Sequence, residues 1–122
     1  MLTPGGNTDE KVTWYAGRKH YEELLAGGVR IYEYRPTMVH AKTIVVDRVF
    51  CVVGTINFDN RSMSLNDEVA LLVQAEEPAR AIHDRFLDDL ERADELDLES
   101  FRRRPARERL VETAAVVFSR LI

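Results

Sequence analysis

Four polar residues near the middle of the chain have the types and spacing that phosphoryl chemistry needs. His40 and Lys42 are two positions apart in a β-branched run, so on a strand both side chains would point to one face. A second apolar run ends at Gly54, where the backbone can turn, and Thr55 and Asn57 follow. If the two strands are neighbours, an imidazole, an ammonium, a hydroxyl and an amide converge. Such a group could bind and attack a phosphoryl group, and we expect no metal or other cofactor.

The complete spacing is H-x-K, four residues, Asp, six residues, then G-T-x-N, and it resembles the H-K-D motif of the phospholipase D superfamily. The matching positions are His40, Lys42, Asp47, Gly54, Thr55, Asn57 and Glu68. Within that superfamily the continuation N-F-D-N-R-S-M-S-L-N-D-E is similar to bacterial cardiolipin synthases. The flanking segments L-L-A-G-G-V-R-I-Y-E-Y and R-R-R-P-A-R-E-R-L are similar to them too, so the resemblance extends over most of the chain.

The resemblance gives each polar residue an expected role. Imidazole is a competent nucleophile toward phosphorus near neutral pH, so His40 is the candidate nucleophile, and Glu68 would hold its second nitrogen. Lys42 and Asn57 would bind the non-bridging phosphate oxygens, whose charge grows in the transition state. Thr55 stands where family members often have Ser and keeps the hydroxyl. It would either donate a further hydrogen bond to the phosphate or support the site.

Other residues of similar chemical type have simpler interpretations. Asp47 belongs to the motif and to the predicted catalytic set, but its strand parity is opposite to that of His40 and it follows an apolar run. This predicts a turn or a supporting position rather than contact with the phosphate. His20 and His83 lie in helical surroundings without a partner pattern. The single cysteine, Cys51, lies in an apolar run and is expected to be buried, and one cysteine fits a reducing compartment.

The elements that must position these residues alternate between strand and helix periodicity. The expected strands are a short one at the N-terminus and four near 29–34, 39–46, 49–56 and 68–74. The first expected helix covers 13–26, with Thr13 as its cap, and the second covers 78–93. A final helix has Pro105 in its first turn. This order predicts an α/β fold with a mixed β-sheet flanked by helices, a phospholipase D-like half-domain. Compared with the superfamily, it looks truncated at its N-terminus.

We divide the chain at residue 95. Residues 1–95 are predicted to form the catalytic half-domain with one H-K-D motif, and 96–122 a basic connector and an amphipathic helix. The apolar stripe of that helix comprises Leu110, Val111, Ala114, Val117, Phe118 and Leu121. A basic entry followed by an apolar face is typical of a helix lying on anionic lipid, and also of one docking on a protein core. The lipid substrate implied by the resemblance favours the membrane.

Composition limits the function further. The chain has 122 residues, 45% of them hydrophobic and 31% charged, which predicts one globular domain. A net charge of -4 argues against general nucleic-acid binding. What the resemblance implies is an enzyme that makes cardiolipin from two molecules of phosphatidylglycerol, at the cytoplasmic face of the bacterial membrane. Its second motif would come from a homodimer mate or a complementary half. The alternatives are a phosphodiesterase of the same superfamily (phospholipase D or nuclease) and an inactive fragment.

Overall fold

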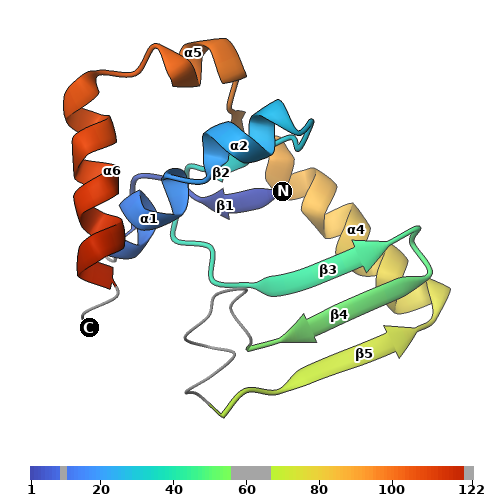
Figure 1. Cartoon of the computed structure of the whole chain (residues 1–122). Helices are drawn as coiled ribbons and strands as arrows, with labels where there is room; N and C mark the ends of the chain where they lie inside the picture. Colours follow the sequence, from blue (N-terminus) through green and yellow to red (C-terminus); the bar gives the residue numbers. More distant parts are fainter. Residues whose placement is uncertain (9–10, 56–66, 120–122) are drawn as a thin grey trace. The chain divides into compact units, whose positions relative to one another are not determined.

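The computed structural model describes residues 1–8, 11–55 and 67–119, which form two compact units (Figure 1). Unit 1 consists of Met1–Val39 together with Leu90–Ile122, and unit 2 of His40–Asp89. Each unit combines a three-stranded sheet with helices, so the predicted α/β class is confirmed. The division at residue 95 stays a prediction, and in the structure residues 96–119 fold with the N-terminal segment.

The sheet of unit 1 is mixed. Strands β1 (Leu2–Pro4) and β2 (Tyr32–Tyr34) are parallel, and β2 pairs antiparallel with β6 (Ala93–Glu95). At the end of β1, Gly5 lies so close to β2 that a Cβ atom on it would be 2.5 Å from the Tyr34 carbonyl oxygen. Strand β6 lies where the sequence predicted the end of a helix. That helix, α4 (Glu76–Leu90), begins and ends earlier than expected.

The predicted helix over 13–26 is two helices, α1 (Lys11–Arg18) and α2 (Tyr21–Ala26). The break follows Gly17, whose carbonyl accepts from the His20 amide in an i to i+3 bond at 3.1 Å. Thr13 lies inside α1 and is not a cap, so that prediction is wrong. The predicted end at Gly27 and Gly28 is confirmed, and Gly28 has the positive φ of 86° typical of such ends.

The core of unit 1 is formed by Tyr21, Ile31 and Phe101. Burial raises the pKa of the Tyr21 hydroxyl above its ordinary value. Phe101 comes from α5 (Leu98–Arg102), a short helix that the sequence did not predict. Asp97 caps it by accepting from the Ser100 amide at 2.8 Å, and that bond lowers the pKa of the Asp97 carboxyl.

The last helix, α6 (Ala106–Ser119), packs against α1 through its charged face. Glu112 is completely buried, and Ala115 is buried one turn further along. The predicted apolar stripe points the other way, since Leu110, Val111, Val117 and Phe118 are all exposed. The prediction that the stripe could dock on the core is therefore wrong: the helix docks, but with its opposite face. Leu121 lies outside the described residues.

Unit 2 contains an antiparallel sheet of β3 (Lys42–Val46), β4 (Phe50–Gly54) and β5 (Ala70–Gln74), followed by α4. The strand pairing puts Val45, Cys51 and Val73 in one row on one face, and Cys51 is buried as predicted. In Figure 1, α4 is drawn behind this sheet.

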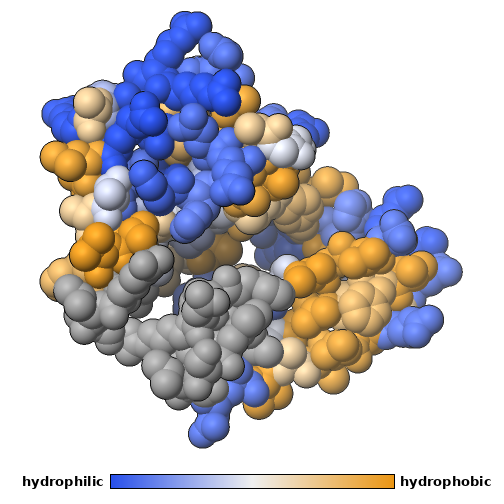
Figure 2. Space-filling model, in the orientation of Figure 1, coloured by the Kyte–Doolittle hydropathy of each residue, from blue (hydrophilic) through white to orange (hydrophobic). Residues whose placement is uncertain are grey.

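The other face of the sheet in unit 2 is apolar and open. Ile44, Val52 and Leu72 form its central row, and Leu72 is 64% exposed. Val46 adds a further exposed side chain next to this row. Figure 2 shows hydrophobic residues gathered over β3, β4 and β5. An apolar sheet face normally packs against another layer, so this face suits a covering partner.

Candidate active site

The three strands of unit 2 bring His40, Lys42, Gly54, Thr55 and Glu68 to one end of the sheet. Lys42 at the start of β3 pairs with Gly54 at the end of β4, and Gly54 pairs with Ala70 at the start of β5. His40 precedes this row by two residues, Thr55 follows Gly54 directly, and Glu68 precedes Ala70 by two residues. The predicted neighbourhood of the strands is thus confirmed. The antiparallel register is what converts distant sequence positions into one cluster.

Thr55 and Glu68 are joined by hydrogen bonds from both side chain and backbone. The Thr55 hydroxyl donates to Glu68 Oε2 and accepts from the Val69 amide at 3.1 Å, while the Thr55 amide donates to the Val69 carbonyl at 2.9 Å. The hydroxyl has a single proton, and in this arrangement it serves the carboxylate. This favours the supporting role that the sequence left open. A hydrogen bond from Thr55 to phosphate stays a prediction.

Gly54 allows this close contact between the strands because no side chain fits at its position. A Cβ atom at Gly54 would lie 2.4 Å from the Val69 carbonyl oxygen and 2.8 Å from the Ala70 Cα. The sequence suggested a turn at this glycine, whereas the structure shows a close approach of two backbones. The backbone of Val69 is therefore part of the site, and sequence reasoning missed it. A glycine at the end of an apolar strand was the available signal.

Lys42 lies close to the candidate nucleophile. Its Nζ donates to the carbonyl oxygen of His40 at 2.8 Å, so the ammonium is held beside the backbone that carries the imidazole. Strand β3 begins at Lys42, later than expected, and His40 is exposed just before it. The predicted sharing of one strand face by both residues therefore does not apply, although the Lys42 ammonium contacts the His40 backbone.

Two predicted contacts concern the orientation of His40 and the amide of Asn57. Within the described residues, no hydrogen bond joins His40 to Glu68, although both lie at the same end of the sheet. Asn57, the predicted second phosphate ligand, lies outside the described residues. The orientation of His40 by Glu68 and the amide contact of Asn57 both stay predictions.

Asp47 lies at the opposite end of the sheet. It is in the turn between β3 and β4, where Asp47 and Arg48 both have positive φ, 54° and 58°, and the Val49 amide bonds the Val46 carbonyl at 3.2 Å. Five residues of strand separate it from Lys42, about 16 Å. The interpretation as a turn is confirmed, and the geometry of unit 2 gives no support to a catalytic role for Asp47.

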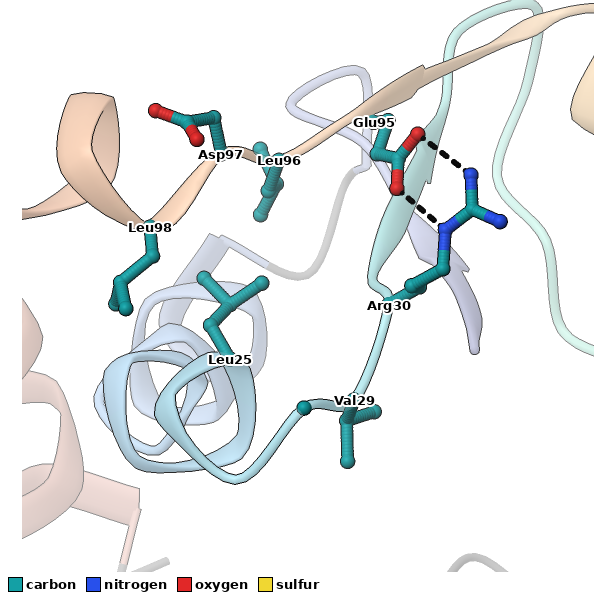
Figure 3. Close-up of a pocket in the computed structure, with 8 residues that line it drawn as sticks. Leu25, Val29, Arg30, Glu95, Leu96, Asp97 and Leu98 are labelled. Atoms are coloured by element: carbon teal, nitrogen blue, oxygen red, sulfur yellow. Dashed lines mark hydrogen bonds and ion pairs between the residues drawn. The ribbon is translucent and has the colours of Figure 1, made fainter.

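A hollow in unit 1 contains no motif residue. It has a volume of about 510 Å³ and is lined by Leu25, Gly28, Val29, Arg30, Glu95, Leu96, Asp97 and Leu98. In Figure 3 the Arg30 guanidinium and the Glu95 carboxylate face each other through two hydrogen bonds, of 2.7 and 2.9 Å. This pairing lowers the pKa of Glu95 and occupies the guanidinium. The hollow therefore offers no cation for a phosphate.

The described residues contain no group of three or more His, Cys, Asp or Glu side chains that could hold a metal ion. Among the helices in that part of the chain, none combines the length and apolar character needed to cross a bilayer.

Comparison with known proteins gives a consistent answer. The family model described as "Cardiolipin synthase, PLD-like domain" matches residues 1–90. Cardiolipin synthase of Geobacillus thermodenitrificans (strain NG80-2) is 41% identical over 115 residues, which cover 93% of this chain and 23% of that protein. Cardiolipin synthase 2 of Bacillus anthracis is 36% identical over 122 residues, which cover 100% of this chain and 24% of that protein. No solved structure matches significantly.

The chain spans about a quarter of the length of these curated relatives. The match to the family model includes the whole of unit 2, and with it the cluster of His40, Lys42, Thr55 and Glu68. An α/β fold with these residues at one end of a sheet agrees with that match. On this combined evidence from fold, site and similarity, the chain belongs to the family of cardiolipin synthase, PLD-like domains.

Proposed function

We propose that the chain supplies one half of a phosphatidyltransferase site that makes cardiolipin at the cytoplasmic face of the bacterial membrane, as a peripheral protein. The observation that carries this proposal is the placement of His40, Lys42, Thr55 and Glu68 at one end of the unit 2 sheet. The names of the relatives supply the reaction and hence the lipid substrate.

The reaction divides into two displacements at the same phosphorus. A ring nitrogen of His40 attacks the phosphorus of phosphatidylglycerol, the bond to the glycerol oxygen breaks, and glycerol leaves with a proton. The headgroup hydroxyl of a second phosphatidylglycerol then attacks the phosphatidyl-histidine, loses its proton, and breaks the phosphorus–nitrogen bond. Cardiolipin and free His40 result. Lys42 and Asn57 would stabilise the charge on the phosphoryl oxygens in both steps.

A second imidazole is needed for the protons. His40 is bonded to phosphorus in the intermediate, so another group must protonate the leaving glycerol and later accept the proton of the incoming hydroxyl. The chain contains one copy of the motif. We infer that the second histidine comes from a second motif, in a homodimer mate or in a complementary half.

Trapping the intermediate tests the proposal. The chain, alone and mixed with a complementary half, is incubated with phosphatidylglycerol labelled in its phosphatidyl part and then denatured. Wild type should retain a label that survives alkali and is lost in acid, as phosphohistidine is. The H40A variant should retain none, whereas H83A, which changes a histidine of α4, should label like wild type. Label retained on H40A would refute the assignment of His40 as the nucleophile.

The products separate transfer from hydrolysis. Both reactions pass through the same covalent species, so the cluster in unit 2 is compatible with either. Cardiolipin among the products would support transfer, whereas phosphatidic acid alone would show a phosphodiesterase with water as acceptor. The absence of both, together with no covalent label in either mixture, would show an inactive chain.

Mixing variant and wild-type chains tests the source of the second histidine. In a homodimer with a shared site, adding H40A chains should lower activity faster than the fraction of wild-type chains falls, because mixed dimers have one His40 only. A linear decrease would show that one chain provides all the reacting groups or that the second half is a different protein.

A further inference from the structure

Helix α6 is held in unit 1 by buried ion pairs on one face, and its apolar face is left exposed. Glu112 accepts hydrogen bonds from the Arg104 guanidinium at 2.9 and 3.1 Å and pairs with Arg18 at 3.7 Å. Its carboxylate is fully buried, and both arginines are nearly so. The Phe101 ring lies next to both guanidinium groups, 3.9 Å from Arg104 and 5.1 Å from Arg18. A buried network of this kind fixes which face of a helix points inward.

The outward face is consequently apolar and exposed. Leu110 is 72% exposed and Val117 60%, and Phe118 and Val111 are also exposed. At 100° per residue these four lie within one side of the helix, opposite Glu112. Figure 2 shows hydrophobic residues along the left margin of the view, where Figure 1 places α6. A stripe of this kind on a helix of about 21 Å is long enough to lie along a surface.

The outward face of α6 has a cation at its edge. Arg107 lies on the same side of α6, one turn before Leu110 and Val111, and it forms no ion pair within the described residues. Of the two acidic residues of α6, Glu112 lies on the opposite side and is paired with its arginines, and Glu108 lies between Glu112 and Val111 around the helix. Unit 1 contains twelve basic and twelve acidic residues and unit 2 five and nine, so the net charge of -4 belongs to unit 2.

We propose that the outward face of α6, formed by Leu110, Val111, Val117 and Phe118 with Arg107 at its edge, docks on an anionic lipid bilayer. An apolar stripe enters the boundary between headgroups and acyl chains, and a cation beside it pairs with lipid phosphate. An anionic bilayer is the partner proposed here because the positive charge of Arg107 complements the negative charge of lipid phosphate. This inference rests on the proposed function for the kind of surface, but the binding test below contains no turnover, so the two can fail separately.

Vesicle flotation measures the docking directly. The intact chain is mixed with vesicles of phosphatidylglycerol and phosphatidylcholine in equal parts, or of phosphatidylcholine alone. We expect binding to the anionic vesicles that weakens as salt is raised. H40A should bind like wild type, so a chain that is inactive for catalytic reasons still tests the docking.

A double variant with a matched control locates the contact. L110Q/V117Q removes two apolar side chains from α6 and should weaken binding at least tenfold. L71Q/L72Q removes two leucines of β5 with similar exposure, 63% and 64%, and should bind like wild type. Far-ultraviolet circular dichroism checks that both remain folded. Equal losses in the two variants, or none in L110Q/V117Q, would overturn the proposal.

Single charge changes test the cation. R107Q should weaken binding about fivefold on the anionic vesicles and leave phosphatidylcholine binding unchanged, because one basic residue near a charged surface has an effect of that size. R85Q, an exposed arginine of α4, is the control. A chain that binds no vesicles would refute the docking on a bilayer. A dimer in lipid-free solution that L110Q/V117Q converts to monomer would also refute it, and would identify a protein as the partner of this face.

Discussion

The two units of the chain are stabilised in different ways. Unit 1 joins segments far apart in the sequence, and its contacts include a buried carboxylate, Glu112, held by Arg18 and Arg104. Unit 2 is continuous, its strands pair with their neighbours in sequence, and Cys51 and Ala79 are its only buried side chains within the described residues. Most of the buried side chains therefore lie in unit 1, whereas the candidate site residues lie in unit 2.

This difference bears on how the site is held. Local antiparallel pairing places His40, Lys42, Thr55 and Glu68 together with few long-range contacts. Because long-range contacts are few, the sheet face with Ile44 and Leu72 is left uncovered. We infer that the reactive unit depends on surfaces outside itself for rigidity, as expected when a site needs a second half.

Each unit contains a natural probe. The only tryptophan, Trp14, lies in α1 of unit 1, and the only cysteine, Cys51, is buried in β4 of unit 2. Tryptophan fluorescence therefore follows unit 1, and the rate at which a thiol reagent modifies Cys51 follows the opening of unit 2. These two measurements allow each prediction below to be assigned to one unit.

The largest effect is expected for E112Q. Loss of the carboxylate charge leaves Arg104 and Arg18 buried without their partner, which should destabilise unit 1 by about 3–5 kcal/mol. The Trp14 transition in urea should move to a markedly lower concentration. The control is E99Q, which breaks an exposed pair with Arg103 in the same unit and should cost less than about 0.5 kcal/mol. Equal midpoints for the two variants would contradict a stabilising role for the buried network.

The next effect is expected for G54A. The added methyl group would collide with the Val69 carbonyl, so β4 and β5 must separate at the site, at about 1–3 kcal/mol. Modification of Cys51 should accelerate while the Trp14 midpoint stays unchanged.

The matched variant in unit 1 is G5A, because its Cβ would meet the Tyr34 carbonyl in the same way. There the Trp14 midpoint should fall and the Cys51 rate should stay constant. If both variants move both probes together, the two units unfold as one, and the comparison drawn above fails.

The sequence predicted unit 2 better than unit 1 for a physical reason. Strands such as β3 and β4 are read from apolar runs, and pairing between neighbours in sequence needs no long-range information. The site cluster could therefore be predicted from His40, Lys42 and Gly54. The tight approach at Gly54 could not, because a glycine signals a turn and a close contact equally well.

Unit 1 was harder to predict because its pairings are distant. Strand β6 has the sequence A-D-E, which is too short and too polar for periodicity to distinguish it from the end of α4. The orientation of α6 was also hidden, because the amphipathic pattern identifies the apolar face while Arg104 and Glu112 decide which face is buried. An ion pair eight residues apart is not visible as a pattern in a single sequence.

A smaller, kinetic effect is expected at Thr55. T55V removes the hydroxyl that donates to Glu68 and accepts from Val69. We expect the lost hydrogen bonding to raise the activation free energy by about 1 kcal/mol, so labelling of His40 should slow roughly fivefold. T55S keeps the hydroxyl and should label like wild type.

A double-mutant cycle distinguishes the two roles of Thr55. If it acts by positioning Glu68, T55V should have little further effect in an E68Q background, since the group it positions is already altered. If it binds the phosphate directly, the two losses should multiply. Rates that multiply would restore the phosphate contact predicted from the sequence.

The smallest effect is a stabilisation, expected for G17A. Gly17 lies in the last turn of α1, and nothing is within 4 Å of the place where its Cβ would be, so alanine adds no collision. Alanine restricts the unfolded chain and favours the helix, which should stabilise unit 1 by about 0.5–1 kcal/mol. The Trp14 midpoint should rise while the Cys51 rate stays unchanged. G28A is the contrasting variant: Gly28 has the same open surroundings but a φ of 86°, so alanine should lower the midpoint. A fall with G17A would show that the break between α1 and α2 requires glycine at position 17.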